Sequence, residues 1–261
     1  MRCDDNLFRG LILTNYGAFQ QPVDAADIAY SVARPASGGF RIARGQETLA
    51  EVTSNEAVQY MFLYVLEKLL TIDLQNLRTD LYFIHSSALE RSGRVTLIVA
   101  ESGTGKSTTT WALLKHGYHY LSDELAPIDP AGPDVHPYPH ALCLKAPPPG
   151  PYPLPENAVR TERTIHIPVT ALPSAAVTQP SPLRALLFLQ RDAHVSAPTV
   201  AAVSPAEAGA RLYANTLNAL AHPGSGLDVA VRIAGAVPAF VINAGDLRAT
   251  CELISELEED L

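Results

Sequence analysis

The first 79 residues alternate between short apolar segments and polar turns. Segments 26–33 and 39–52 have the composition of short strands and are separated by a glycine- and proline-containing turn at residues 35–39. Ser54 or Asn55 can cap a helix, because the apolar residues that follow recur at helical spacing up to about Leu74. The pattern therefore predicts a small α+β region over residues 1–79.

From residue 80 onward, continuous apolar runs alternate with helical patterns. Runs of this kind are typical of strands that are buried on both faces of a sheet. A hairpin that turns near residues 90–93 is expected to pair the first two strands, and the runs 118–121 and 125–128 are expected to form another strand pair. The predicted strands are 81–84, 95–99, 118–121, 125–128, 183–190 and 237–243. Three helices are predicted: one over residues 106–115, one that begins at Ser204-Pro205, and one from Gly245-Asp246 to about Leu257. The alternation predicts an α/β domain over residues 80–261.

Residues 145–182 are rich in proline and interrupt this alternation. One interpretation is a loop that covers the core. The other is a lid or substrate loop beside an active site, since long loops in compact domains are often functional.

Composition narrows the class of protein. With 47% hydrophobic and 18% charged residues, the chain of 261 residues has enough apolar material for one large domain, or for one domain with a small appendage, and long disorder is not expected. The net charge of -8, without a visible basic face, argues against a nucleic-acid partner. The N-terminus lacks the apolar core of a signal peptide, and no apolar run is long enough to span a membrane. The three cysteines, Cys3, Cys143 and Cys251, have the spacing of neither a metal site nor a disulfide framework. These observations predict a cytoplasmic protein without a membrane partner.

A glycine-rich segment lies between the predicted strand 95–99 and the predicted helix 106–115. It matches the P-loop pattern G-x-x-x-x-G-K-[ST], except that Ala100 replaces the first glycine. Glycines let the backbone curl so that successive N–H groups point inward, and the following helix adds its positive dipole end. Lys106 is expected to reach the β- and γ-phosphates of ATP or GTP, and the Ser107 hydroxyl is expected to bind Mg²⁺. The alternative is that the glycine-rich segment is a purely structural turn. The predicted phosphate-binding residues are Ser102, Gly103, Thr104, Gly105, Lys106, Ser107 and Thr108.

Asp123 and Glu124 follow this helix at the end of a short strand. One carboxylate can hold Mg²⁺ together with Ser107, and the other can accept a proton from an attacking hydroxyl. The alternative is a surface turn between two strands. His85, at the end of the strand 81–84, is a further catalytic candidate or else a packed histidine. Weaker candidates for phosphate or substrate contact are Arg191 and Lys145, which could equally be solvated surface residues.

Residues 84–88, 95–108 and 113–124 together resemble the HPr serine kinase family, which has a histidine before the P-loop strand and an acidic pair after a helix and a short strand. More specifically, the chain resembles HPr-kinase-related proteins found with peptide-modification clusters, including lasso-peptide tailoring kinases. The resemblance implies a mixed-sheet, PEP-carboxykinase-like nucleotide-binding core. Two departures argue against HPr itself as the substrate: Glu124 stands where the family has a second aspartate, and no Glu-x-Arg-Gly signature is present.

The resemblance and the motifs together predict a nucleoside-triphosphate-dependent kinase that phosphorylates a serine hydroxyl. In this hypothesis Lys106 and Mg²⁺ spread the charge on the phosphoryl group, Asp123 accepts the hydroxyl proton, and His85 orients the acidic pair or the γ-phosphate. The expected acceptor is a peptide or protein, such as a ribosomal peptide precursor of the lasso type. Alternatives are a kinase for a small metabolite such as free serine, an ATPase or nucleotide-binding regulator, and a non-catalytic binding module. A homo-oligomer is compatible with the resemblance, since hexamers occur in that family.

Overall fold

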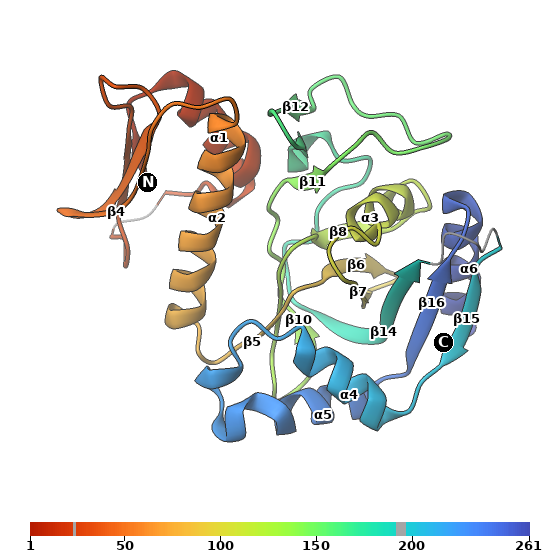
Figure 1. Ribbon diagram of the computed structural model, residues 1–261. Helices are drawn as coiled ribbons and strands as arrows, with labels where there is room; N and C mark the ends of the chain where they lie inside the picture. Colours follow the sequence, from red (N-terminus) through yellow and green to blue (C-terminus); the bar gives the residue numbers. More distant parts are fainter. Residues whose placement is uncertain (23–24, 192–196) are drawn as a thin grey trace.

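The structure of the protein is a computed structural model, and it describes residues 1–22, 25–191 and 197–261. A smaller N-terminal region lies beside a larger α/β body (Figure 1). The long helix α2 (Val58–Leu77) stands between the two, and its lower end leads into the first strand of the body. None of the helices formed by the described residues combines the length and the apolar character that crossing a membrane requires.

The N-terminal region consists of a four-stranded sheet covered by two helices. The strands are β1 (Arg2–Cys3), β2 (Tyr30–Ala33), β3 (Phe40–Arg44) and β4 (Glu47–Val52), in that spatial order. Helix α1 (Asn6–Tyr16) packs beside α2 and is followed by the 3₁₀ turn η1 (Gly17–Phe19). The aromatic rings of Phe8, Phe40 and Phe62 join the sheet to both helices, with the centroids of Phe8 and Phe62 4.6 Å apart.

Helix α1 was not predicted from the sequence. Gly10, inside the helix, lowers its intrinsic propensity, so that the helix depends on tertiary contacts. Its start is fixed by Asp5, whose side chain accepts a hydrogen bond from the backbone N–H of Phe8 at 3.1 Å. Helix α2 does follow the predicted periodicity, and it buries Phe62, Leu63 and Leu66.

The α/β body is built on a mixed nine-stranded sheet. Strand β14 (Ser181–Arg191) lies at its centre and pairs in parallel with β7 (Arg94–Val99) and β16 (Ala239–Ala244), whereas the other pairings are antiparallel. The main path runs β5-β9-β10-β14-β7-β6-β8, and β16 and β15 form a branch from β14, in which β15 pairs with β16. The remaining strands are β5 (Tyr82–Ile84), β6 (Ser87–Arg91), β8 (His119–Ser122), β9 (Ala126–Ile128), β10 (Asp134–Val135) and β15 (Thr199–Ala202).

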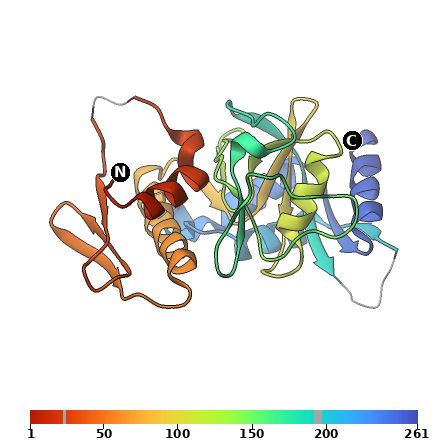
Figure 2. The same ribbon diagram turned by 90° about the horizontal axis from the view of Figure 1, so that it is seen from above.

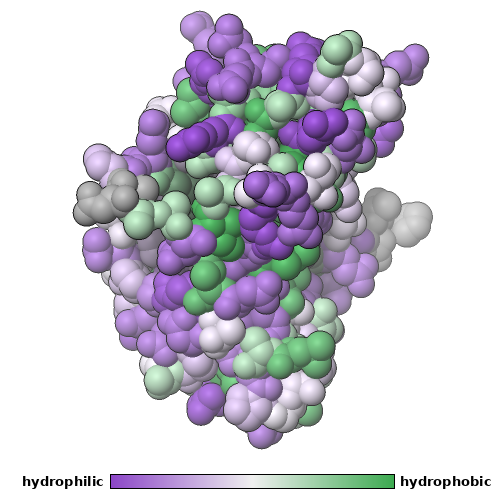
Figure 3. Space-filling view, turned by 90° about the vertical axis from the view of Figure 1, so that its left-hand side faces the viewer, coloured by the Kyte–Doolittle hydropathy of each residue, from purple (hydrophilic) through white to green (hydrophobic). Residues whose placement is uncertain are grey.

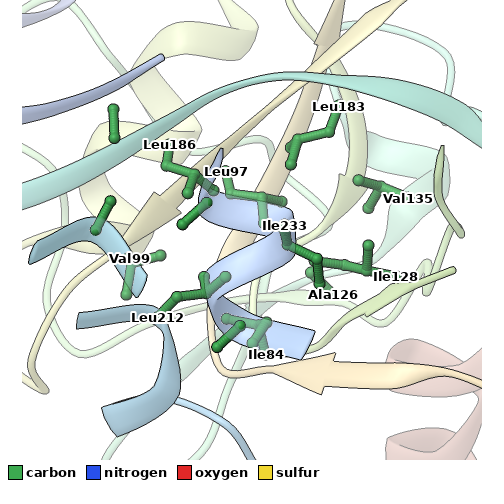
Figure 4. Close-up of a cluster of buried hydrophobic side chains, with 14 of the residues drawn as sticks. Ile84, Leu97, Val99, Ala126, Ile128, Val135, Leu183, Leu186, Leu212 and Ile233 are labelled. Carbon is green, nitrogen blue, oxygen red and sulfur yellow. The ribbon is translucent and has the colours of Figure 1, made fainter. Parts of the chain in front are cut away.

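Helices cover both faces of this sheet, which explains its continuously apolar strands. Leu97 and Val99 belong to a cluster that includes Leu212 of α4 (Pro205–Ala214) and Ile233 of α5 (Leu227–Ala236) (Figure 4). Ile98 lies in a second cluster on the opposite face, under α3 (Lys106–Leu114) and α6 (Leu247–Glu259). The 3₁₀ turns η3 (Ala219–Ala221) and η4 (Pro223–Gly226) connect α4 to α5.

The proline-rich segment covers the core, as the first interpretation expected, and residues 145–147, 149, 164 and 166 also line the cavity at the start of α3, so the second interpretation stays open. It contains β12 (Val159–Arg160), β13 (Ile165–Ile167) and the 3₁₀ turn η2 (Val169–Ala171), and β13 pairs with both β12 and β11 (Leu142–Leu144). Tyr152 is buried against α3, where its carbonyl accepts a hydrogen bond from the indole of Trp111 at 3.2 Å. The segment is thus a small sheet with loops packed on α3 (Figure 2).

Two predicted strand pairings were wrong. Strand β5 does not pair with β7; it pairs with β9, and the strand that forms the hairpin with β7 is β6. Strands β8 and β9 likewise do not pair with each other, because β8 pairs with β6 and β9 with β5 and β10. Apolar runs identify strands but carry no information about their partners, which depend on contacts distant in sequence. Strand β15 and helix α5 were also not predicted.

Candidate functional site

The glycine-rich loop, residues 101–105, connects the end of β7 to the start of α3. Gly103 and Gly105 have φ angles of 92° and 112°, a backbone conformation that L side chains rarely adopt, and a Cβ at either position would meet open space. Helix α3 begins at Gly105 without a side-chain cap, so that its first-turn N–H groups and its positive dipole end are not satisfied by a capping side chain. This arrangement can bind an anion.

Lys106, the first residue of α3, is buried against Asp123, which follows β8. Its ammonium donates a hydrogen bond to the main-chain carbonyl of Asp123 and lies 3.6 Å from Oδ1 of the same residue. Asp123 is completely buried. The loop and the acidic pair, separate in sequence, therefore meet through one ion pair.

Two hydroxyl groups orient the Asp123 carboxylate. Ser87, in β6, donates to Asp123 Oδ1 at 2.6 Å, and Thr110, in α3, lies 2.8 Å from the Ser87 oxygen. Since the Ser87 proton goes to Asp123, the Thr110 hydroxyl donates to Ser87. Neither residue was predicted from the sequence; the signal available for Ser87 was a hydroxyl at the start of an apolar run, where a buried polar group is costly without a partner.

The two carboxylates of the acidic pair have different environments. Burial raises the pKa of Asp123, and the nearby ammonium of Lys106 offsets only part of that rise. Oδ2 of Asp123 is buried and has no hydrogen-bond partner among the residues that the structure describes. For Glu124 burial alone would also raise the pKa, but the hydrogen bond with His85 and the charges of Lys106 and His85 outweigh burial and lower it. Glu124 Oε2 lies 3.2 Å from His85 Nε2, and both side chains are partly exposed.

His85, Lys106 and Glu124 line a cavity of about 790 Å³, whereas the fully buried Asp123 does not. Lys145, at the rim, donates to the Ser102 hydroxyl at 3.0 Å, and Arg191, the last residue of β14, also lines the cavity. The structure thus places His85, Lys106 and Glu124, most of the loop and both weaker candidates around one space. Two predicted residues do not line the cavity. Asp123 is fully buried and adjoins it only through Lys106, and Thr104 donates its N–H to the Glu101 carbonyl.

The donor set fits Mg²⁺ better than a metal held by protein ligands alone. Within residues 1–22, 25–191 and 197–261, no group of three or more His, Cys, Asp or Glu side chains could hold a metal ion. Mg²⁺ is usually held by one or two carboxylates, with waters and substrate phosphates completing its shell. The Ser107 hydroxyl and the Glu124 carboxylate, which both line the cavity, are oxygen donors of the required kind.

The wall of the cavity opposite the glycine-rich loop comes partly from the N-terminal region, which sequence analysis did not foresee. Helix α2 contributes part of it, and Asn15 of α1 lies beside His166 and Cys143. The residues from α2 are Tyr60, Leu63, Tyr64, Glu67 and Lys68. Only the packing of the N-terminal region on the α/β body brings them to the site.

No protein-family model matches the sequence, and neither does any curated protein. Among solved structures, the chain is similar to the Hpr(Ser) kinase/phosphatase from Coxiella burnetii, with 15% identity over 68% of this chain and 88% of that chain and a TM-score of 0.34. Because the identity and the TM-score are this low, a function has to be inferred from the site itself.

Proposed function

We propose that this protein is a nucleoside-triphosphate-dependent phosphotransferase that phosphorylates a serine hydroxyl on a peptide or protein. The observation that carries the proposal is the contact between Lys106, which lines the cavity at the uncapped start of α3, and Asp123, which is buried against it. An anion-binding helix start, a cation and a metal-binding hydroxyl line one cavity, and a carboxylate with a raised pKa is buried against the cation; these are the parts that phosphoryl transfer needs.

In this proposal the loop N–H groups and Lys106 bind the triphosphate of ATP or GTP. Because a phosphate oxygen is a stronger acceptor for an ammonium than a main-chain carbonyl, Lys106 leaves the carbonyl of Asp123 for the nucleotide. That movement uncovers the Asp123 carboxylate, which is completely buried beneath it. Mg²⁺, held by Ser107 and one acid of the pair, would supply charge neutralisation on the phosphates.

Asp123 accepts the proton of the acceptor hydroxyl at Oδ2. Its other oxygen, Oδ1, is fixed by the relay from Thr110 through Ser87, so that Oδ2 has a defined direction. The raised pKa makes Asp123 a stronger base than an exposed aspartate. Glu124 stays ionised beside His85, which leaves it suited to metal binding or to orienting His85.

The peptide acceptor is supported by the resemblance of the chain to HPr-kinase-related proteins found with peptide-modification clusters, which include lasso-peptide tailoring kinases. A small-metabolite kinase and a nucleotide hydrolase would use the same loop and the same lysine. The acceptor therefore has to be identified by experiment.

The test is a transfer assay with γ-labelled ATP or GTP and Mg²⁺, in which the acceptor is a degenerate serine-centred peptide library, free L-serine or water alone. We expect label on the peptides, and we expect Lys106→Met to reduce transfer by about 10²–10³-fold or more, as for loss of one preorganised charge-stabilising donor. Lys115→Met is the matched control, since Lys115 is an exposed lysine at the other end of α3 that does not line the cavity. Undiminished transfer by Lys106→Met would refute the proposal, and free phosphate as the only product would identify a hydrolase.

A further inference from the structure

The cavity extends to both sides of the Lys106–Asp123 contact. In Figures 1 and 2, α2 and α6 lie on opposite sides of α3. On the α6 side the cavity is lined by Arg191 and Thr250 together with residues 244–247, and on the α2 side by Tyr60, Leu63, Tyr64, Glu67 and Lys68. The order of strands decides which side holds the nucleoside.

Ligands of α/β sheets bind outside the carboxyl ends of the parallel strands. Here the parallel strands are β7, β14 and β16, and both Arg191 and Ala244 are carboxyl-terminal residues of β14 and β16. The nucleoside therefore belongs on the α6 side. His85 and Glu124 flank β6 and β8, which lie on the other side of β7, so that the reacting end of the triphosphate points toward α2.

We propose that the α2 side of the cavity is the acceptor subsite, and that it binds an extended peptide segment with the reactive serine and an acidic residue close to it. This inference rests on the proposed function and names the part of the chain that recognises the substrate. Tyr64 and Lys68 are its recognition residues. The N-terminal region thus determines specificity, while the α/β body supplies the chemistry.

The length of this wall matches a peptide rather than a single amino acid. From Tyr60 to Lys68 an α-helix rises about 12 Å at 1.5 Å per residue, which is the length of about three to four residues of extended chain. Free serine would contact only one end of it. The rings of Tyr60 and Tyr64 are stacked, with centroids 6.1 Å apart, and such rigid aromatic surfaces bind peptides at low cost in side-chain entropy.

The charge at the far end of the wall selects an acidic group. The Lys68 ammonium lies 5.5 Å from the centre of the Tyr64 ring and its side chain is 56% exposed. The Glu67 carboxylate lies 3.6 Å from this ammonium, but ion pairs of a lysine that is more than half exposed to solvent contribute little. Lys68 therefore remains available to a carboxylate of the acceptor.

The wall is held rigidly on the α/β body. The Glu162 carboxylate, from the turn between β12 and β13, accepts hydrogen bonds from the N–H groups of Gln59 (3.3 Å) and Tyr60 (2.9 Å) in the first turn of α2. The Arg163 guanidinium lies over the Tyr60 ring at 5.3 Å. Glu162 thus acts as a cap supplied from a distant part of the chain, and it fixes α2 beside the cavity.

The experiment uses the full-length chain, γ-labelled ATP with Mg²⁺, and the serine-centred peptide library, with free L-serine as a competitor. Tyr64→Ala and Lys68→Glu are expected to raise the KM for peptide by about tenfold, the effect of truncating one anchoring residue, while displacement of a fluorescent ATP analogue stays unchanged. Lys68→Glu is also expected to abolish or reverse the preference for acidic peptides. Ile72→Ala is the matched control, because Ile72 is exposed on the same helix but does not line the cavity.

Peptide KM values for Tyr64→Ala and Lys68→Glu that equal those of Ile72→Ala would overturn the inference. Free L-serine phosphorylated in preference to the library would do so as well. If Lys106→Met still abolishes transfer in these cases, the proposed phosphotransferase stands and only the acceptor subsite is wrong. If the unaltered protein labels neither the peptides nor serine, both proposals fail.

Discussion

The side-chain oxygen of Asn15, in α1, accepts a hydrogen bond from Nδ1 of His166, in β13, at 2.7 Å. Asn15 is oriented by its own amide, which donates to the Leu11 carbonyl at 2.8 Å. Nδ1 of His166 therefore carries the proton, and Nε2 accepts from the Thr164 hydroxyl at 2.7 Å. Burial lowers the pKa of His166 to about 4, in agreement with a neutral ring. This buried contact joins the N-terminal region to the α/β body beside the cavity.

Asn15→Ala is expected to lower the free energy of unfolding by about 1–3 kcal/mol, because it leaves the buried Nδ1–H of His166 without its acceptor. Thermal or urea unfolding measures the loss. The neighbouring variant Thr14→Ala is the control, since the Thr14 hydroxyl is exposed and bonds only to the Gly10 carbonyl of its own helix. Equal stability of the two variants would show that the contact does not hold the regions together.

Asp123→Asn is expected to lower kcat for transfer by about 10²–10⁴-fold, the usual contribution of a general base, with a smaller effect on nucleotide affinity. The amide keeps the shape and the bond from Ser87 but removes the proton acceptor. Asp134→Asn, an exposed aspartate in β10, is the control. An equal loss of transfer and of nucleotide binding would instead indicate a metal-binding or structural role.

The assignment of Asp123 as the base implies that the rate of phosphoryl transfer depends on pH. A base acts only when it is deprotonated, and burial raises the pKa of Asp123. The rate is therefore expected to fall as the pH decreases through this raised pKa, at a pH above the ordinary aspartate value of about 3.9. The measurement is kcat/KM for the nucleotide against pH, because this quantity reports the free protein, in which Asp123 is buried. A rate that stays constant down to the ordinary aspartate range would contradict the assignment of Asp123 as the base.

Gly105→Ala is expected to weaken nucleotide binding and to destabilise the protein by about 1–2 kcal/mol. The added methyl group meets open space, but the φ of 112° is strained for an L residue, so the loop would have to change its conformation. Gly10→Ala is the opposite case, because Gly10 lies inside α1 with space around it, and alanine there is expected to stabilise by about 0.5–1 kcal/mol. Nucleotide titration and thermal unfolding of both variants test this pair.

Glu258→Gln is expected to stabilise the protein at neutral pH. Glu258, in α6, is 1% exposed, and neither carboxylate oxygen has a hydrogen-bond partner among the described residues. Burial raises the pKa of Glu258, so the folded state disfavours the charged carboxylate. The resulting loss of stability is absent at a pH below the pKa that Glu258 has in the unfolded chain, and it is complete at a pH above the pKa in the folded protein. The stability that Glu258→Gln gains over the unaltered protein is therefore expected to disappear as the pH falls toward about 4.

The control for this variant is Glu259→Gln. Glu259 forms an exposed ion pair with Arg91 at 2.9 Å, and pairs of this kind contribute little. Unfolding temperatures of both variants between pH 4 and 8 provide the measurement. A Glu258→Gln variant that is less stable than the unaltered protein at neutral pH would show that the charged carboxylate is satisfied in the fold.

The sequence by itself determined the features that depend on a few neighbouring residues. The continuously apolar run 95–99, the glycines at 103 and 105 and the helix that follows are local patterns, and the structure reproduces them as β7, the loop and α3. Ser204 and Asp246 cap α4 and α6 as their positions before the helices predicted. Periodicity, φ requirements and capping all act within a few residues, so they can be read without knowledge of the fold. That this loop binds a nucleotide remains a prediction.

Only the tertiary structure decided which of these elements meet. The pairing of β5 with β9 and of β6 with β7, the bonds that Ser87 and Thr110 form around Asp123, and the position of α2 beside the cavity all join residues far apart in the chain. Such contacts depend on how the whole chain buries its apolar surface and satisfies its polar groups, and no local pattern contains that information. The acceptor side of the cavity, built from two regions of the chain, exists only after that burial is complete.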